Sequence, residues 1–213
     1  MRHLIRRLTG TGRKVGLIPR QFRRDGVIFI HVPKCAGSAL LDSYLGFQTG
    51  HVTARTYRDA DPGFFRSAYV FTFVRNPLSR FVSAYGHVCT DDLWAFLPEV
   101  RAVVNRHGSS ASEVAAALTP DSELLRLPWF APQHTFLELH PGGQPAVNRA
   151  FKTENFATDL ELLQADVPIR LRPIAEVNRR GGQDPDPSAG LSAAAVAALR
   201  RVYARDFTLF GYY

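Results

Sequence analysis

The chain contains only two cysteines, Cys35 and Cys89, among 213 residues. Two cysteines cannot build the disulfide framework of a small secreted protein, so a reducing cytoplasm is the simpler location. No stretch approaches the roughly 18 uninterrupted apolar residues of a membrane-spanning helix, so none is predicted. No group of cysteines and histidines has the spacing of metal ligands, and we therefore expect no metal.

Acidic residues are missing from the first 24 positions, where all the charges are basic. The basic residues there are Arg2, Arg6, Arg7, Arg13, Lys14, Arg20, Arg23 and Arg24. Without these eight, 18 basic residues stand against 19 acidic ones, so this segment carries +8 of charge, the rest about −1, and the excess of positive charge belongs to the segment. A body of that charge does not favour extended contact with a nucleic acid.

The same segment also lacks the apolar core of a secretory signal, because Gly10, Gly12, Gly16 and Pro19 interrupt it. We predict a basic N-terminal arm over residues 1–24 and a single domain over residues 25–213. Contact of the arm with an anionic membrane surface stays open, since a basic segment is attracted to such a surface. The expected location is therefore cytoplasmic, with peripheral membrane contact as an option.

Two strand-to-helix turns stand out in the first half of the chain. Residues 27–32 are an apolar, β-branched run typical of a strand buried on both faces, and a small-residue turn over 33–38 precedes a predicted helix over 39–45. Residues 69–74 are a second strand, followed by the turn Arg75-Asn76-Pro77 and a helix that continues to Tyr85. Such turns expose backbone N–H groups at a helix N-terminus, where anions bind.

This order predicts an α/β fold, specifically a P-loop-like three-layer α/β/α arrangement with a central parallel sheet. A helical insert is expected over residues 92–127, where Pro98, Gly108 and Pro120 divide helix-forming stretches. Later elements are a strand over 146–151, a helix over 156–163 and a final helix capped by Ser192.

A Walker A loop has the order G-x-x-x-x-G-K-[ST], whereas here Lys34 precedes the small residues. A small-metabolite kinase of the P-loop class, which would need Mg²⁺, is therefore an alternative and not the leading interpretation. A non-catalytic module that binds a nucleotide bisphosphate is a second alternative.

The sequence HVPKCAGSAL at 31–40 resembles the 5′-phosphosulfate loop of sulfotransferases that use 3′-phosphoadenosine 5′-phosphosulfate (PAPS). FTFVRNPLSRFVSAY at 71–85 resembles the 3′-phosphate motif of their carbohydrate branch, with Asn76 in place of the usual aspartate. KTENF at 152–156 and YARDFTLFGY at 203–212 are similar to late segments of that branch, which includes uronyl 2-O- and chondroitin-type enzymes. The resemblance covers residues 27–213 and implies transfer of a sulfuryl group from PAPS to a hydroxyl, with a carbohydrate as the expected acceptor.

The resemblance also implies roles for individual residues. Lys34 would neutralise charge on the oxygen that bridges phosphate and sulfur, and Arg75 and Ser83 would bind the 3′-phosphate. The residues of the 5′-phosphosulfate loop would be Pro33, Lys34, Cys35, Ala36, Gly37, Ser38 and Ala39.

A hydroxyl acceptor needs a base, and seven histidines are available. Gly50-His51-Val52 resembles the GHV of uronyl 2-O-sulfotransferases, in which the matching histidine is the base, so Lys34 and His51 are the predicted catalytic residues. His87 and His134 stay open as alternative bases or as residues of the acceptor pocket. His31, at the end of the first strand, is expected to be packed.

Overall fold

The computed structural model describes residues 17–89, 98–174 and 186–213. It consists of two compact units. Unit 1 extends to Val74 and resumes with residues 133–182, and unit 2 comprises residues 75–132 and 183–213. Each unit is described by itself below. The prediction of one domain over residues 25–213 stays a prediction.

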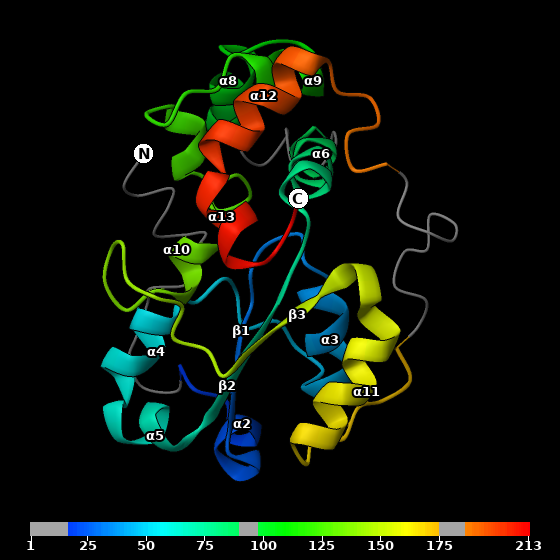
Figure 1. Ribbon diagram of the computed structural model, residues 1–213. Helices are drawn as coiled ribbons and strands as arrows, with labels where there is room; N and C mark the ends of the chain where they lie inside the picture. Colours follow the sequence, from blue (N-terminus) through cyan, green and yellow to red (C-terminus); the bar gives the residue numbers. More distant parts are fainter. Residues whose placement is uncertain (1–16, 90–97, 175–185) are drawn as a thin grey trace. The chain divides into compact units, whose positions relative to one another are not determined.

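A three-stranded parallel sheet forms the centre of unit 1, in the order β1-β2-β3 (Figure 1). The strands are β1 (Val27–Ile30), β2 (Tyr69–Val74) and β3 (Arg149–Lys152). All of β1 and nearly all of β2 is buried, as their unbroken runs of apolar side chains predict. Thr72 is buried in the middle of β2, and its hydroxyl donates to the Ile30 carbonyl at 2.8 Å.

Helices cover both faces of this sheet. The helices of unit 1 are α2 (Arg20–Asp25), α3 (Gly37–Tyr44), α4 (Ala54–Ala60), α5 (Pro62–Ser67), α10 (His134–Leu137) and α11 (Phe156–Asp166), with the short 3₁₀ helix η2 (Thr153–Asn155). In Figure 1, α3 and α11 lie on one side of the strands and α4 and α5 on the other. The predicted α/β class with a parallel sheet and flanking helices is therefore confirmed.

The end of the predicted basic arm is part of the folded structure. Helix α2 includes residues 20–24, and its Phe22 is fully buried. The Phe22 ring stacks on Tyr44 at 5.9 Å between centroids and lies 6.4 Å from Tyr57. The boundary predicted at residue 24 thus falls within a helix that packs into unit 1, while residues 1–16 lie outside the described part of the chain.

Unit 2 is helical over its described residues. Its helices are α6 (Pro77–Val88), α8 (Pro98–Asn105), α9 (Ala111–Ala116), α12 (Ala193–Val202) and α13 (Ala204–Leu209), with the 3₁₀ helix η1 (Glu123–Arg126). Helix α12 packs against both α6 and α9. The predicted helical insert corresponds to α8, α9 and η1, except for its first residues, 92–97, which lie outside the described ranges.

Helix α6 packs against the core of unit 2. The Phe81 ring of α6 lies 5.5 Å from that of Phe130, and the Tyr203 hydroxyl donates to the Phe130 carbonyl at 2.7 Å. Ser192 caps α12 by accepting from the Ala195 N–H, as predicted.

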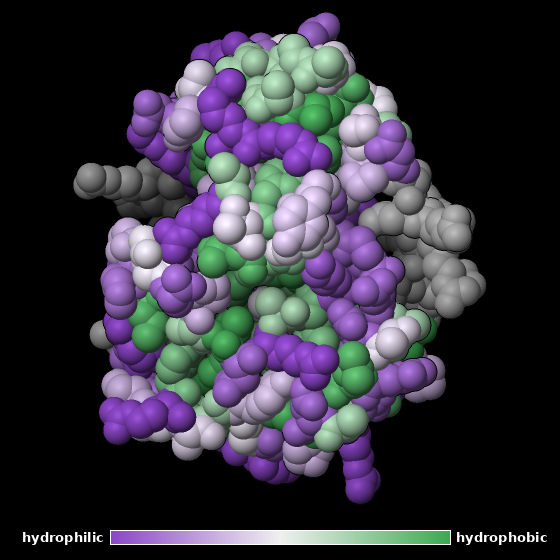
Figure 2. Space-filling model, viewed as in Figure 1, coloured by the Kyte–Doolittle hydropathy of each residue, from purple (hydrophilic) through white to green (hydrophobic). Residues whose placement is uncertain are grey.

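On the face drawn in Figure 2, hydrophilic residues alternate with small apolar areas. Of the helices formed by described residues, none has the length and apolar character needed to cross a bilayer.

Candidate functional site

The loop between β1 and α3 has an unusual backbone. Lys34 and Ala36 adopt φ angles of 67° and 57°, the left-handed region that residues with a Cβ rarely occupy. Each such residue costs on the order of 1 kcal/mol or more, so the surrounding structure must hold the loop in this shape. Strand β1 ends at Ile30, two residues before the predicted end, because the Val32 N–H turns back to the Ile30 carbonyl.

The first turn of α3 has no side-chain cap. Ala36 is the N-cap residue, and it has no side chain that could accept from the first turn. Helix α3 begins at Gly37, two residues earlier than predicted, so the N–H groups of Gly37, Ser38 and Ala39 belong to its first turn. Uncapped N–H groups at the N-terminus of an eight-residue helix suit an anion.

The side chains of the loop point in different directions. Cys35 is buried, and its thiol donates to the side-chain oxygen of the fully buried Gln133 at 3.2 Å. Lys34 is half-buried and Ser38 is exposed. Cys35 therefore anchors the loop with its sulfur, and what it can offer a ligand is its backbone N–H.

Gln133 is a residue of this site that the sequence did not reveal. It is 98 positions from Cys35 in the chain, and only its neighbour His134 was predicted as a residue of the site. A buried amide has no local sequence signal, because its partner is known only once the fold brings the two segments together.

Two histidines lie beside the loop. The Nδ1 atom of His51 is 3.1 Å from the carbonyl oxygen of His31, and the two rings are 4.5 Å apart between centroids. Because a carbonyl only accepts, Nδ1 of His51 carries the hydrogen, and the lone pair of the neutral ring is on Nε2. A histidine oriented in this way by a backbone carbonyl is suited to accept a proton at Nε2.

His31 differs from His51 in burial and charge. Only 5% of its surface is exposed. Burial, followed by repulsion from His51 in its protonated form and from the Lys34 ammonium, lowers the pKa of His31 to about 3. The prediction that His31 is packed agrees with this environment, and its ring is neutral at physiological pH.

Arg75 and Asn76 lie at the start of α6 in unit 2. The Asn76 side chain accepts from the Leu78 N–H at 3.0 Å, and Pro77 occupies the first helical position. Asparagine thus provides the N-cap that the usual aspartate would provide. Arg75 Nε donates to the Ser79 hydroxyl at 3.1 Å, which orients the guanidinium along the first turn of α6.

Ser79, Ser83 and His87 follow one another at intervals of four residues on α6, which places them along one face of the helix. Ser83 is half-buried, and His87 is exposed with its ring 6.0 Å from that of Trp129. Arg80 has the opposite environment, because only 1% of it is exposed. Ser79, which the sequence did not single out, is therefore the residue that connects Arg75 to the face of Ser83.

His134 is the first residue of α10 in unit 1. Its Nε2 atom is 4.0 Å from Oε1 of the buried Glu138. The predicted residues are thus distributed as follows: the loop 33–39, His51 and His134 belong to unit 1, and Arg75, Ser83 and His87 belong to unit 2. Within unit 1, His31 brings the loop and His51 together.

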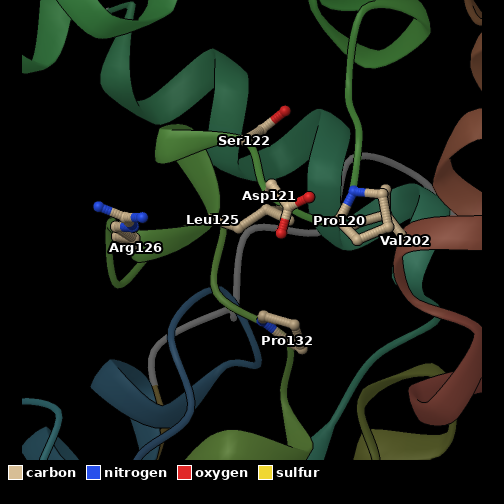
Figure 3. Close-up of a pocket in the computed structure, with 7 residues that line it drawn as sticks. All are labelled: Pro120, Asp121, Ser122, Leu125, Arg126, Pro132 and Val202. Carbon is tan, nitrogen blue, oxygen red and sulfur yellow. The ribbon is translucent and has the colours of Figure 1, made fainter.

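Unit 2 also has a pocket of about 320 Å³, which is shown in Figure 3. It is lined by Pro120, Asp121, Ser122, Leu125, Arg126, Pro132 and Val202. No residue predicted for the site lines it. Over the described ranges, histidine, cysteine and acidic side chains do not gather into a group that could hold a metal ion.

Comparison with protein families supports the resemblance seen in the sequence. Residues 20–127, about half of the chain, match the sequence model described as the sulfotransferase family. The matched range includes the loop 33–39, His51, Arg75 and Ser83. Comparisons with curated proteins and with solved structures gave no significant match.

Proposed function

The chain belongs to the sulfotransferase family, and we propose that it transfers a sulfuryl group from PAPS to a hydroxyl of a carbohydrate acceptor. The family supports an enzyme that transfers sulfuryl groups. The donor, the kind of acceptor and the residues involved are our proposal. The observation that carries it is the strained loop of uncapped N–H groups with Lys34 at one end and His51 close by, connected through His31.

PAPS carries two anionic groups, and the described residues offer a suitable environment for each. The N–H groups at the start of α3 and the Lys34 ammonium suit the 5′-phosphosulfate. Arg75, oriented by Ser79, and the hydroxyl of Ser83 suit the 3′-phosphate, since a planar guanidinium binds two phosphate oxygens at once.

The proposed reaction is an in-line displacement at sulfur. The acceptor hydroxyl oxygen forms a bond to sulfur while the bond from sulfur to the 5′-phosphate oxygen breaks. The hydroxyl proton goes to Nε2 of His51, and Lys34 stabilises the charge that develops on the leaving phosphate oxygen. The products are a sulfate ester and adenosine 3′,5′-bisphosphate.

The carbohydrate acceptor rests on the resemblance of the loop and of the α6 motif to the carbohydrate branch. Donor residues alone say little about the acceptor. A screen of hydroxyl-bearing acceptors, read by mass spectrometry of sulfated products, addresses this point directly. We also propose a cytoplasmic location, because a sequence with only two cysteines, Cys35 and Cys89, does not imply a disulfide framework.

A thermal-shift comparison tests the donor. Adenosine 3′,5′-bisphosphate should raise the melting temperature, because a ligand bound only by the native state stabilises it by about 2.7 kcal/mol at a hundred times its Kd. Adenosine 5′-monophosphate should raise it far less, since it lacks the group proposed to contact Arg75 and Ser83.

ATP with Mg²⁺ serves as the control ligand, because a P-loop kinase would be stabilised by it. Equal shifts from the mono- and bisphosphate would overturn the assignment of the 3′-phosphate residues. A larger shift from ATP with Mg²⁺ would favour phosphoryl transfer over sulfuryl transfer.

A further inference from the structure

The residue that separates the loop from His51 is His31, a buried histidine to which the proposed reaction assigns no role. Nδ1 of His31 is buried and has no hydrogen-bond partner among the described residues. A buried polar atom without a partner lowers stability, and an apolar side chain would avoid that loss. Hydrogen bonding through Nδ1 therefore does not explain why position 31 is a histidine. The explanation has to come from the packing contacts of its ring.

On one side, the edge of the His31 ring lies against Gly37. A Cβ built on Gly37 would lie 2.6 Å from Nε2 of His31 and closer still to Cδ2. Real Cβ atoms do not approach ring atoms that closely, so residue 37 has to be glycine as long as the ring stays in place. The ring consequently touches the backbone of the first residue of α3 directly.

On its other sides, the His31 ring contacts two aromatic rings, which prevent it from moving away from Gly37. Phe29, in β1 two residues before His31, stacks on it at 6.0 Å between ring centroids and 19° between ring planes. The His51 ring lies 4.5 Å away at 59°. A flat five-membered ring fits between these groups and the glycine, whereas a branched leucine or a larger phenylalanine would not approach the Gly37 backbone as closely.

We propose that His31 is a positioning residue whose neutral ring fixes where α3 begins, and thereby holds the loop N–H groups in place for the 5′-phosphosulfate. This proposal rests on the proposed function. It explains how a loop with two residues in the left-handed region keeps its shape, since Lys34 and Ala36 lie between His31 and Gly37. The ring acts as a spacer between the end of the strand and the start of the helix.

The test is the contribution of the loop to ligand affinity, measured by calorimetry as a ratio. Adenosine 3′,5′-bisphosphate and adenosine 3′-monophosphate differ only in the 5′-phosphate, so the ratio of their Kd values reports on the loop. We expect the wild type to prefer the bisphosphate by about tenfold or more, as hydrogen bonds to a charged group imply. His31→Ala should reduce this preference at least about fivefold, while the affinity for the 3′-monophosphate stays unchanged.

Gly37→Ala tests the same contact from the side of the loop and replaces His31→Ala should that variant fail to fold. It should lower the preference, because its Cβ displaces the His31 ring. The double variant His31→Ala/Gly37→Ala should recover part of the preference relative to Gly37→Ala alone, since the missing ring leaves room for the methyl group. Ile28→Ala, a core substitution in β1, is the control, and it should lower the melting temperature without changing the ratio.

The possible results separate this proposal from the proposed function. A wild type without preference for the bisphosphate would contradict the assignment of the loop and the proposed function with it. A wild type with the preference, together with single variants that keep it, would overturn the role of His31 alone. Strictly additive effects of His31→Ala and Gly37→Ala would also overturn it, because the two groups would then not be in the contact described.

Discussion

The loop 33–38 in unit 1 and the segment 75–83 in unit 2 are both strand-to-helix turns with a basic residue, yet they are built differently. In the loop, two residues with side chains occupy the left-handed region, and the N-cap offers no side-chain acceptor. In the second segment, Asn76 caps α6 and proline begins it, so the backbone is of the ordinary kind. The first turn of α3 has no side-chain cap, whereas in α6 the Asn76 side chain accepts from the Leu78 N–H.

This difference indicates two ways to recognise an anion. The loop relies on backbone groups, whose position depends on buried contacts such as that of Cys35 with Gln133. The α6 segment relies on the side chains of Arg75 and Ser83, one of which Ser79 orients. Substitutions of buried residues that contact the loop should therefore weaken ligand binding. Substitutions of buried residues that pack against α6 should lower the free energy of unfolding and leave ligand binding intact.

The largest effect is expected at His51, which lies beside the loop. His51→Ala should lower turnover by about a hundredfold to ten-thousandfold, because a positioned base contributes that much. Affinity for adenosine 3′,5′-bisphosphate should stay within about twofold, since the base acts on the acceptor. The measurement is turnover with an acceptor identified by the product screen, alongside calorimetry.

His107 provides a matched control for His51. Its Nδ1 atom is 2.9 Å from the Val103 carbonyl, so it too is oriented by a backbone carbonyl, but it has no part in the proposed reaction. His107→Ala should leave turnover unchanged. Loss of turnover in His87→Ala or His134→Ala, with His51→Ala active, would show that another histidine is the base.

Lys34 is expected to have the next largest effect and tests the loop itself. Lys34→Ala should reduce turnover by about a hundredfold to a thousandfold, as removal of a preorganised donor does. Donor affinity should fall as well, because the charge contacts PAPS in the ground state too. Lys34→Gly separates charge from backbone, since glycine accepts a φ of 67° without strain. Near-normal turnover in the glycine variant would mean that the residue serves only the shape of the loop.

Ser83 tests the side-chain mode of binding. Ser83→Ala should weaken adenosine 3′,5′-bisphosphate about tenfold, the expected loss for one hydrogen bond to a charged group. The affinity for adenosine 5′-monophosphate should not change, because that nucleotide lacks the 3′-phosphate. Equal weakening of both nucleotides in a calorimetric titration would place the effect in the helix and not in the contact.

The elements that the sequence predicts well are those with local signals. Strand β2 has the predicted bounds, since six apolar or β-branched residues end at a turn with proline. Helices α4 and α5 were not predicted, although Thr53 and Asp61 accept from the N–H groups of Thr56 and Phe64 as N-caps do. Their sequence has no continuous apolar stripe, and the caps alone were not read as helix starts.

What the sequence could not show about the site is its tertiary support. The sequence motif predicted the position and the residues of the loop. No rule based on composition predicts that a lysine or an alanine adopts the left-handed backbone region. Such a conformation depends on tertiary contacts, here of Gly37 with His31, just after β1, and of Cys35 with Gln133, far along the chain. Burial of Phe22 is a similar case, because only the fold reveals the aromatic pocket that takes up the end of a basic segment.

The smallest effect is expected in the core of unit 2, which packs against α6. A substitution of a buried residue there should lower stability and leave ligand binding intact. Tyr203→Phe removes the hydroxyl that donates to the Phe130 carbonyl, and should lower the free energy of unfolding by about 1–3 kcal/mol because that buried acceptor loses its partner. Burial raises the pKa of Tyr203, so its hydroxyl stays protonated and the loss should be the same across neutral pH. Tyr69→Phe, which loses an exposed bond to Asp166, is the control with a smaller loss in urea unfolding. A change in the preference of Tyr203→Phe for the bisphosphate over adenosine 5′-monophosphate would show that α6, like the loop, depends on the packing beneath it.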